Sequence, residues 1–181
     1  MERLARGRRV LDLYSYVGAF GLAAARGGAS EVLAFDGNAA VVAEGAAIAA
    51  ANGLAERVSF ARGDVKNVLG DLIAEGRRFD LVVVDPPKLA PTVRHLTRAQ
   101  AAYRRLNARA LEVLERGGLL VSCSCSSALK ADDLLRVIAL AARDAAREVT
   151  LLAMGQQGMD HPVPVAFPEG RYLKCAFVRA L

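Results

Sequence analysis

The segment 79–88, FDLVVVDPPK, constrains the fold of this chain more than any other stretch. Its apolar run 81–84 leads without interruption into Asp85, Pro86 and Pro87. Such a run is typical of a strand buried on both faces, as in a parallel sheet. The two prolines end the strand because neither can donate a hydrogen bond to a ladder. We therefore expect Asp85 at the carboxyl edge of the sheet, where open α/β folds bind ligands. The simpler alternative is a capping aspartate in a turn.

Length and composition favour one α/β domain that covers residues 1–181. The chain is long enough for a sizeable core, and 54% of its residues are hydrophobic while only 6% are aromatic. No apolar run approaches the roughly 20 residues of a membrane span, so we expect no membrane partner. Residues 1–9 carry four arginines and no apolar core, which excludes a secretory signal.

Cysteine usage and charge indicate the setting and the kind of partner. Three cysteines without a C-x-x-C pair argue against a disulfide scaffold and a zinc site, so we expect a cytoplasmic protein without a metal. The net charge of +5 favours an anionic partner such as nucleic acid. The oligomeric state stays open, with a homodimer among the alternatives.

Strand and helix patterns alternate along the chain. We expect strands at 8–14, 31–36, 57–62, 79–84, 119–123 or 119–125, 149–154 and 172–178. Helices are expected at 22–26, 38–52, 66–75, 97–114 and 131–146, with Gly117 and Gly118 separating the fourth helix from the fifth strand and a polar excursion at 155–170. This order predicts a doubly wound sheet, mostly parallel, whose short terminal strands pair antiparallel.

A glycine-bearing turn at 15–21 follows the first predicted strand. Strand, glycine turn and helix together present backbone N–H groups and a helix N-terminus to a ligand. Only Gly18 and Gly21 are present, so the G-x-G-x-x-G pattern of dinucleotide-binding proteins is incomplete. The turn therefore favours a ligand with a carboxylate over one with a pyrophosphate, which disfavours a nicotinamide-dependent oxidoreductase.

An acidic residue closes each of the first four predicted strands: Asp12, Asp36, Asp64 and Asp85. Asp36 lies 18 residues beyond Gly18, at a position that suits hydrogen bonding to ribose hydroxyls. Asp64 ends the third strand, where an adenine amino group can be bound. The alternative is that each acid only caps the helix that follows it.

The segment 121–126, VSCSCS, interleaves cysteine with serine. If the strand continues through it, Cys123 and Cys125 share one face, and Cys125 lies nearer to the carboxyl edge and to Asp85. A thiolate there is a suitable nucleophile for an electrophilic ring carbon. The alternative is that both cysteines are small buried hydrophobic residues, which is the only role we expect for Cys175.

These segments resemble a known family. LDLYSYVGAF (11–20), Asp36, Asp64, DPPK (85–88), GGLLVSCSCS (117–126) and YLK (172–174) occur in the order found in class I S-adenosylmethionine (SAM)-dependent methyltransferases. The closest likeness is to the catalytic domain of the bacterial 23S rRNA 5-methylcytosine methyltransferases, over essentially the whole chain. The resemblance implies a Rossmann-like, seven-stranded sheet with an antiparallel C-terminal strand, and SAM as cofactor.

The resemblance also implies roles for individual residues. The turn at 15–21 would hold the methionine part of the cofactor, Asp36 its ribose and Asp64 its adenine. The nucleophile segment of related enzymes falls on Ser124–Ser126, with Cys125 as the nucleophile. The residues implied in cofactor binding are Asp12, Ser15, Tyr16, Gly18, Phe20, Asp36, Gly37, Asp64, Val65 and Asp85. Those implied in binding the substrate are Pro86, Pro87, Lys88, Arg94 and His161.

The chain departs from the family pattern in two places. Related enzymes often carry a second cysteine after the fourth-strand motif, where this chain has Pro86, Pro87 and Lys88. Cys123 or a general base would then assist product release. Family members usually also carry an N-terminal RNA-binding PUA domain and a small linking domain, and neither is found in this sequence.

The hypothesis is that the Cys125 thiolate attacks C6 of an unpaired or flipped cytosine in 23S rRNA while Asp85 binds the ring edge. Basic side chains after the Asp-Pro-Pro turn would contact phosphate, or else form a solvated helix face: Arg94, His95, Arg98, Arg104 and Arg105. His161 would line the substrate pocket or be structural. Competing functions are methylation of guanine N7 or an exocyclic amine, which needs no cysteine, and a non-catalytic RNA-binding module.

Overall fold

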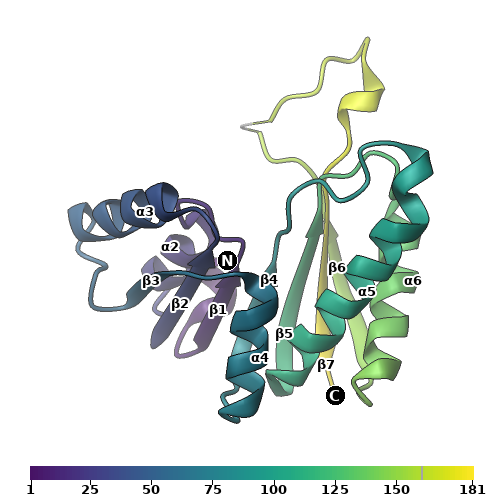
Figure 1. Cartoon of the computed structure of the whole chain (residues 1–181). Helices are drawn as coiled ribbons and strands as arrows, with labels where there is room; N and C mark the ends of the chain where they lie inside the picture. The colour runs from purple at the N-terminus through teal and green to yellow at the C-terminus, as the bar shows by residue number, and fades with distance from the viewer. Residues whose placement is uncertain (160) are drawn as a thin grey trace.

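The computed structural model describes residues 1–159 and 161–181. Within them, seven strands form one sheet in the order β3-β2-β1-β4-β5-β7-β6 (Figure 1). The strands are β1 (Arg9–Leu13), β2 (Glu31–Asp36), β3 (Val58–Arg62), β4 (Phe79–Val84), β5 (Leu114–Ser124), β6 (Val149–Gly155) and β7 (Lys174–Ala180). β1 to β5 are parallel, and β7 pairs antiparallel with both β5 and β6. The predicted fold class is therefore confirmed.

Helices cover both faces of the sheet. They are α1 (Glu2–Ala5), α2 (Ala19–Arg26), α3 (Ala39–Ala51), α4 (Val65–Ala74), α5 (Leu96–Glu112) and α6 (Ala131–Asp144), with 3-10 turns at Val93–His95 and Pro168–Gly170. α4, α5 and α6 pack on the face that points toward the viewer in Figure 1. Residues of α1 and α2 belong to a second core on the opposite face.

β4 is the central strand that its sequence predicts. Leu81, Val82, Val83 and Val84 are all fully buried. Their side chains alternate, so that Val82 and Val84 join the core under α4 to α6 while Leu81 and Val83 join the core on the other face. Burial on both faces explains why the strand is apolar at every position from 81 to 84.

Several element boundaries differ from the prediction, among them those of β5 and β7. β5 begins at Leu114, so the glycine pair lies inside the strand instead of before it. Gly117 has φ +76°, and the pairing with β4 shifts between Phe79 and Leu81. The glycine therefore permits an irregularity in a strand that continues past it. β7 runs from Lys174 to Ala180 instead of 172–178, because its bounds follow its pairing with β5 and β6.

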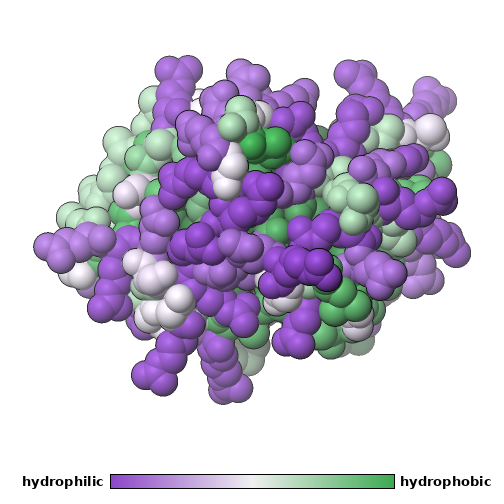
Figure 2. Space-filling model, turned by 90° about the horizontal axis from the view of Figure 1, so that it is seen from below, coloured by the Kyte–Doolittle hydropathy of each residue, from purple (hydrophilic) through white to green (hydrophobic). Residues whose placement is uncertain are grey.

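The two ends of the sheet differ. The carboxyl ends of the parallel strands lie below the excursion formed by residues 156–159 and 161–173, which projects from the top of Figure 1. Figure 2 shows the opposite end, which is covered mostly by hydrophilic residues. There, Arg9 of β1 donates to Asp80 of β4 at 3.2 Å and to Glu115 of β5 at 2.9 Å, which joins three strands. Across the described residues, no helix combines the length and the hydropathy needed to cross a membrane.

Candidate functional site

A cleft of about 570 Å³ opens at the carboxyl edge of the sheet. Its walls come from the loops after β1, β2, β3 and β4, from the end of β5 and from the residue before β7. The residues that line it are Tyr14, Tyr16, Asp36, Gly37, Gly63, Asp64, Val65, Asp85, Pro86, Pro87, Cys125 and Leu173. Eight of the positions singled out in the sequence for cofactor or substrate therefore lie in one cleft, together with Cys125.

Asp12 lies beneath the loop after β1 and is only 1% exposed. Its Oδ2 accepts a hydrogen bond from the Gly21 N–H at 2.8 Å, which ties the start of α2 to the end of β1. Burial raises the pKa of Asp12 to about 7, although the Gly21 bond opposes the shift. Within the described residues, neither Asp12 Oδ1 nor the buried Ser15 hydroxyl has a hydrogen-bond partner. These two polar atoms are therefore available to a polar ligand.

The loop after β1 is held in an unusual backbone conformation. Tyr14 and Tyr16 have φ of +60° and +52°, values that non-glycine residues seldom adopt. The Asp36 carboxylate stabilises this loop, because its Oδ2 accepts from the Tyr16 N–H at 3.0 Å while its Oδ1 accepts from the Asn38 N–H at 2.9 Å. Tyr16 is 63% exposed and lies at the mouth of the cleft. Strain of this kind is common at binding sites.

Asp64 caps the helix that follows it. Its Oδ1 accepts from the Lys66 N–H at 3.0 Å and from the Asn67 N–H at 3.3 Å, at the start of α4. Asp64 also lines the cleft, so the capping interpretation and the ligand-binding one apply to the same side chain. None of the other three acids is the N-cap residue of the helix that follows it, since those caps are Gly18 for α2, Asn38 for α3 and His95 for α5. Asp12 nevertheless accepts from the Gly21 N–H in the first turn of α2.

Asp85 follows β4 directly and is half-buried. Burial raises the pKa of Asp85 above that of an ordinary aspartate. Among the described residues, the side chain makes no hydrogen bond and no ion pair, since only its backbone N–H is engaged, with the Leu13 carbonyl at 3.4 Å. A half-buried carboxyl group that faces a cleft and keeps its proton more readily than usual can both donate and accept hydrogen bonds there.

Cys125 lines the cleft from the turn after β5. Its pKa is raised, first because the side chain is half-buried and second because Asp85 is nearby. Lys88 and Lys174 oppose this shift. β5 ends at Ser124, so Cys125 lies just beyond the strand and beside the end of β4, its neighbour in the sheet.

β5 ends at Ser124, so the strand includes Cys123 but not Cys125, and the shared face expected of a strand that continues through both does not apply. Cys123 lies on the buried side of β5, opposite Cys175 of β7, with 3.0 Å between the two Sγ atoms. It does not line the cleft. The Cys175 thiol and burial both raise the pKa of Cys123, so it stays protonated. A role for Cys123 in product release thus stays a prediction without support from its position.

Gly18 and Phe20, which the resemblance implies in cofactor binding, lie outside the cleft. Gly18 has φ +85°, and a Cβ at this position would lie 2.3 Å from Cζ of Phe60. Glycine is therefore required there by the backbone and by packing. Phe20 packs against the core on the α2 face. Sequence reasoning did not assign Tyr14, Gly63 or Leu173 to the site, although Tyr14 and Leu173 lie within the segments 11–20 and 172–174 and Gly63 precedes Asp64.

Of the residues expected to bind the substrate, Pro86 and Pro87 line the cleft, whereas Lys88, Arg94 and His161 do not. Pro86 is buried and supports the turn, whereas Pro87, Lys88 and Arg94 are exposed. His161 is exposed within the excursion, and its predecessor, residue 160, lies outside the described residues. Arg104 departs from its predicted role, because its guanidinium forms two 2.6 Å bonds with Asp144 of α6. This ion pair engages Arg104 in joining two helices.

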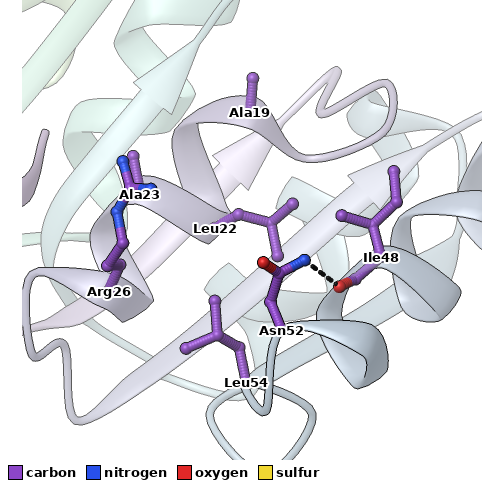
Figure 3. A pocket seen from close by; sticks show the side chains of 7 residues that line it. All are labelled: Ala19, Leu22, Ala23, Arg26, Ile48, Asn52 and Leu54. Atoms are coloured by element: carbon purple, nitrogen blue, oxygen red, sulfur yellow. Dashed lines mark hydrogen bonds between the residues drawn. The ribbon is translucent and has the colours of Figure 1, made fainter.

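A second hollow, of about 300 Å³, lies between α2 and α3 (Figure 3). It is lined by Ala19, Leu22, Ala23, Arg26, Ile48, Asn52 and Leu54. The Asn52 amide donates to the Ile48 carbonyl at 2.8 Å, as the figure shows. No residue predicted to act on a cofactor or substrate lines this hollow.

Comparison with known proteins gives the family. The profile of a family described as S-adenosylmethionine-dependent methyltransferase matches residues 1–156. Two relatives named ribosomal RNA large subunit methyltransferase I are similar over most of the chain. The one from Erwinia tasmaniensis is 38% identical over 96% of this chain, and the one from Shewanella denitrificans is 39% identical over 95%. The chain spans 44% of the length of each of these relatives.

Comparison with solved structures agrees with this family match. A Streptococcus mutans protein described as a SAM-dependent methyltransferase superposes with a TM-score of 0.85 at 25% identity, over 98% of this chain and 46% of that one. A methyltransferase in complex with SAH superposes with a TM-score of 0.82 at 25% identity, over 97% of this chain and 46% of that one. TrmN from Thermus thermophilus shares the fold, with a TM-score of 0.69 at 22% identity. The match covers 99% of this chain and 46% of the TrmN chain.

Proposed function

Because this chain belongs to the S-adenosylmethionine-dependent methyltransferases, we propose that residues 1–181 form a single catalytic domain that methylates cytosine C5 in 23S rRNA. The observation that carries the proposal is that Asp36, Asp64, Asp85 and Cys125 line one cleft. The names of the relatives support an rRNA substrate, and the cysteine beside Asp85 supports chemistry at a ring carbon.

The cleft fits the cofactor. SAM carries an ammonium, ribose hydroxyls and an adenine amino group, and each of these needs a polar partner. Asp12 Oδ1 and the Ser15 hydroxyl are buried without a partner below the loop after β1, which suits the ammonium. Asp36 and Asp64 would bind the ribose and the adenine, while Tyr16, Gly37 and Val65 would form the walls. When bound, SAM supplies an electrophilic methyl group.

On the substrate side, Cys125 and Asp85 act on the same base. The Cys125 thiolate attacks cytosine C6, and the electron pair of the C5–C6 bond makes C5 nucleophilic. Asp85, whose pKa is raised by burial, is placed to donate a proton to N3 of the ring as the thiolate adds, and it takes this proton back when the thiolate leaves. After methyl transfer a base removes the C5 proton, and the electron pair released at C5 expels the Cys125 thiolate. Pro86 and Pro87 keep Asp85 in place.

The rim of the cleft supports an unpaired RNA strand as substrate. Arg94, Arg98 and Arg105 are exposed after the Asp-Pro-Pro turn and are suited to phosphate. Large apolar side chains are exposed on the same edge of the sheet: Tyr16, Val93, Met159, Val165, Phe167 and Tyr172. Exposed aromatic residues next to cationic ones are typical of surfaces that stack unpaired bases. Lys88 and His161 are exposed as well.

Calorimetric titration tests the cofactor assignment first. We expect SAM and SAH to bind and NAD, the control, not to bind. Binding of NAD, or of none of the three by a folded chain, would contradict the assignment of the acids in the cleft.

Methylation of 23S rRNA tests the cysteine. We expect Cys125→Ala to abolish methyl transfer while SAM binding is retained, and Cys123→Ala to retain both. RNA that contains 5-fluorocytosine lacks the C5 proton, so the adduct cannot be resolved and a cross-linked species should remain on a denaturing gel. Methyl transfer by Cys125→Ala would favour the second candidate, methylation of guanine N7 or an exocyclic amine, which Asp85 and the prolines also suit. A chain that binds RNA but neither binds SAM nor transfers a methyl group would be a non-catalytic RNA-binding module.

A further inference from the structure

Both residues that flank Cys125 are fixed by a buried polar network. The Ser124 hydroxyl accepts from Tyr103 Oη of α5 at 2.9 Å and from the Ser126 N–H at 3.2 Å. The Ser126 hydroxyl accepts from the Ala90 N–H at 3.1 Å, in the loop after the Asp-Pro-Pro turn. Ser124 and Ser126 are fully buried. The turn that carries Cys125 is therefore held from α5 and from the loop after β4.

Lys174 holds the same turn from the other side. It is the first residue of β7, directly opposite Ser124 in the antiparallel pairing. Its Nζ donates to the Ser126 carbonyl at 2.6 Å, one residue after Cys125. In the described parts of the chain, none of the ion pairs includes Lys174, although its side chain is half-buried.

A half-buried lysine that lacks a carboxylate partner is costly, because burial disfavours its charged form. Burial lowers the pKa of Lys174 accordingly, and Cys125 opposes that shift. An ammonium has three donors, and only one is used on the Ser126 carbonyl. A negative charge that forms nearby during catalysis would offset the cost, and Cys125 is the adjacent group that can acquire one.

We propose that Lys174 is a positioning residue for Cys125, which anchors the turn through the Ser126 carbonyl and supplies the positive charge that favours the thiolate. This inference rests on the proposed function, in which Cys125 is the nucleophile. Lys88 opposes the raised pKa of Cys125 at least as strongly as Lys174 does by charge alone, but Lys88 is exposed, so solvent and salt screen its charge. Lys174 is the one whose charge is partly shielded from water.

The rate at which iodoacetamide alkylates Cys125, followed by peptide mass spectrometry across a pH series, tests the proposal without RNA or cofactor. We expect Lys174→Met to raise the pH of half-maximal alkylation by about one unit, which is about tenfold less thiolate at a given pH. Lys174→Arg should give a profile close to that of the parent chain, because arginine keeps the positive charge. Lys88→Met is the matched control and should move the profile much less. An unchanged profile in folded Lys174→Met would overturn the proposal.

A reciprocal measurement does not depend on how well the Lys174 variants fold. NMR titration of the Lys174 side chain, in protein labelled with ¹³C-lysine, should give a lower pKa in Cys125→Ala than in the parent chain, because the charge coupling acts equally on both partners. Equal Lys174 pKa values in the two proteins would refute the coupling. Methyl transfer that survives Cys125→Ala would refute the covalent mechanism separately, because neither titration measures methyl transfer.

Discussion

Asp12 ends β1 with a carboxyl group that is almost completely removed from water, and one of its two oxygens lacks a partner among the described residues. Burial raises the pKa of Asp12 to about 7 in the folded chain, against about 3.9 in an unfolded one. The folded state therefore binds this proton more tightly. The free energy of unfolding falls as the pH rises from about 4 to about 7, and above about pH 7 the whole penalty is present.

Asp12→Asn separates stability from cofactor binding. The amide keeps an acceptor for the Gly21 N–H and removes the buried charge. We expect the melting temperature to rise by about 2 °C or more at pH about 8, and to change little at pH about 4. The same variant should bind SAM about tenfold more weakly at pH about 8, because a hydrogen bond from the ammonium to a charged group is lost.

Differential scanning fluorimetry and calorimetry measure the two effects. In the parent chain, SAM affinity should increase as the pH rises through about 7, because only the ionised form of Asp12 attracts the ammonium. The Asn variant should lack this dependence. An Asn variant that binds SAM as tightly as the parent chain would show that Asp12 serves only to hold α2.

At the scale of elements, Asp64 joins a structural role to a predicted ligand-binding one. It caps α4 and lines the cleft, so its simple removal would confound two effects. Asn is as good a helix cap as Asp but carries no charge. The pair Asp64→Asn and Asp64→Ala therefore divides the two roles.

We expect Asp64→Ala to lower the free energy of unfolding by about 1 kcal/mol, since the cap is lost, and Asp64→Asn to change it little. Both variants should weaken SAM binding if the carboxylate binds the adenine amino group. Urea denaturation and calorimetry give the two quantities. If Asp64→Asn binds SAM as tightly as the parent chain, then Asp64 acts only as the N-terminal cap of α4.

At the scale of the whole molecule, positive charge on the rim is expected to dominate RNA affinity. Arg98 and Arg105 lie seven residues apart, about two turns, so they share one face of α5, and Arg94 precedes them in the 3-10 turn. All three are exposed. Arg104 is adjacent in sequence but is paired with Asp144. Arg104 therefore serves as the control for the three exposed arginines.

Replacement of Arg94, Arg98 and Arg105 by Gln should weaken RNA binding and reduce the slope of log K against log salt by about 2, at about 0.7 for each phosphate contact with a single strand. Arg104→Gln should leave the slope unchanged. Fluorescence anisotropy with a labelled single-stranded RNA over a salt series measures this. Equal slopes for all the variants would place the RNA elsewhere on the molecule.

Much of this architecture could be predicted because its signals are local. The run 81–84 requires burial on both faces, Pro86 and Pro87 end the strand, and residues 31–36 form the predicted strand with Asp36 at its edge. Parallel strands place their carboxyl ends at one edge, so Asp36, Asp64 and Asp85 had to lie close together. Fold class and the position of the cleft followed from these local patterns.

Tertiary structure decided what depends on neighbours distant in the sequence. Cys123 faces Cys175 and not the cleft because β5 pairs with β7, and the strand ends at Ser124 before Cys125. Arg104 is engaged because α6 packs beside α5. Lys174 reaches the carbonyl after Cys125 only because β7 runs antiparallel to β5. Contacts between segments distant in the chain produce no local hydrophobic pattern, because neither segment alone shows which other segment it will contact.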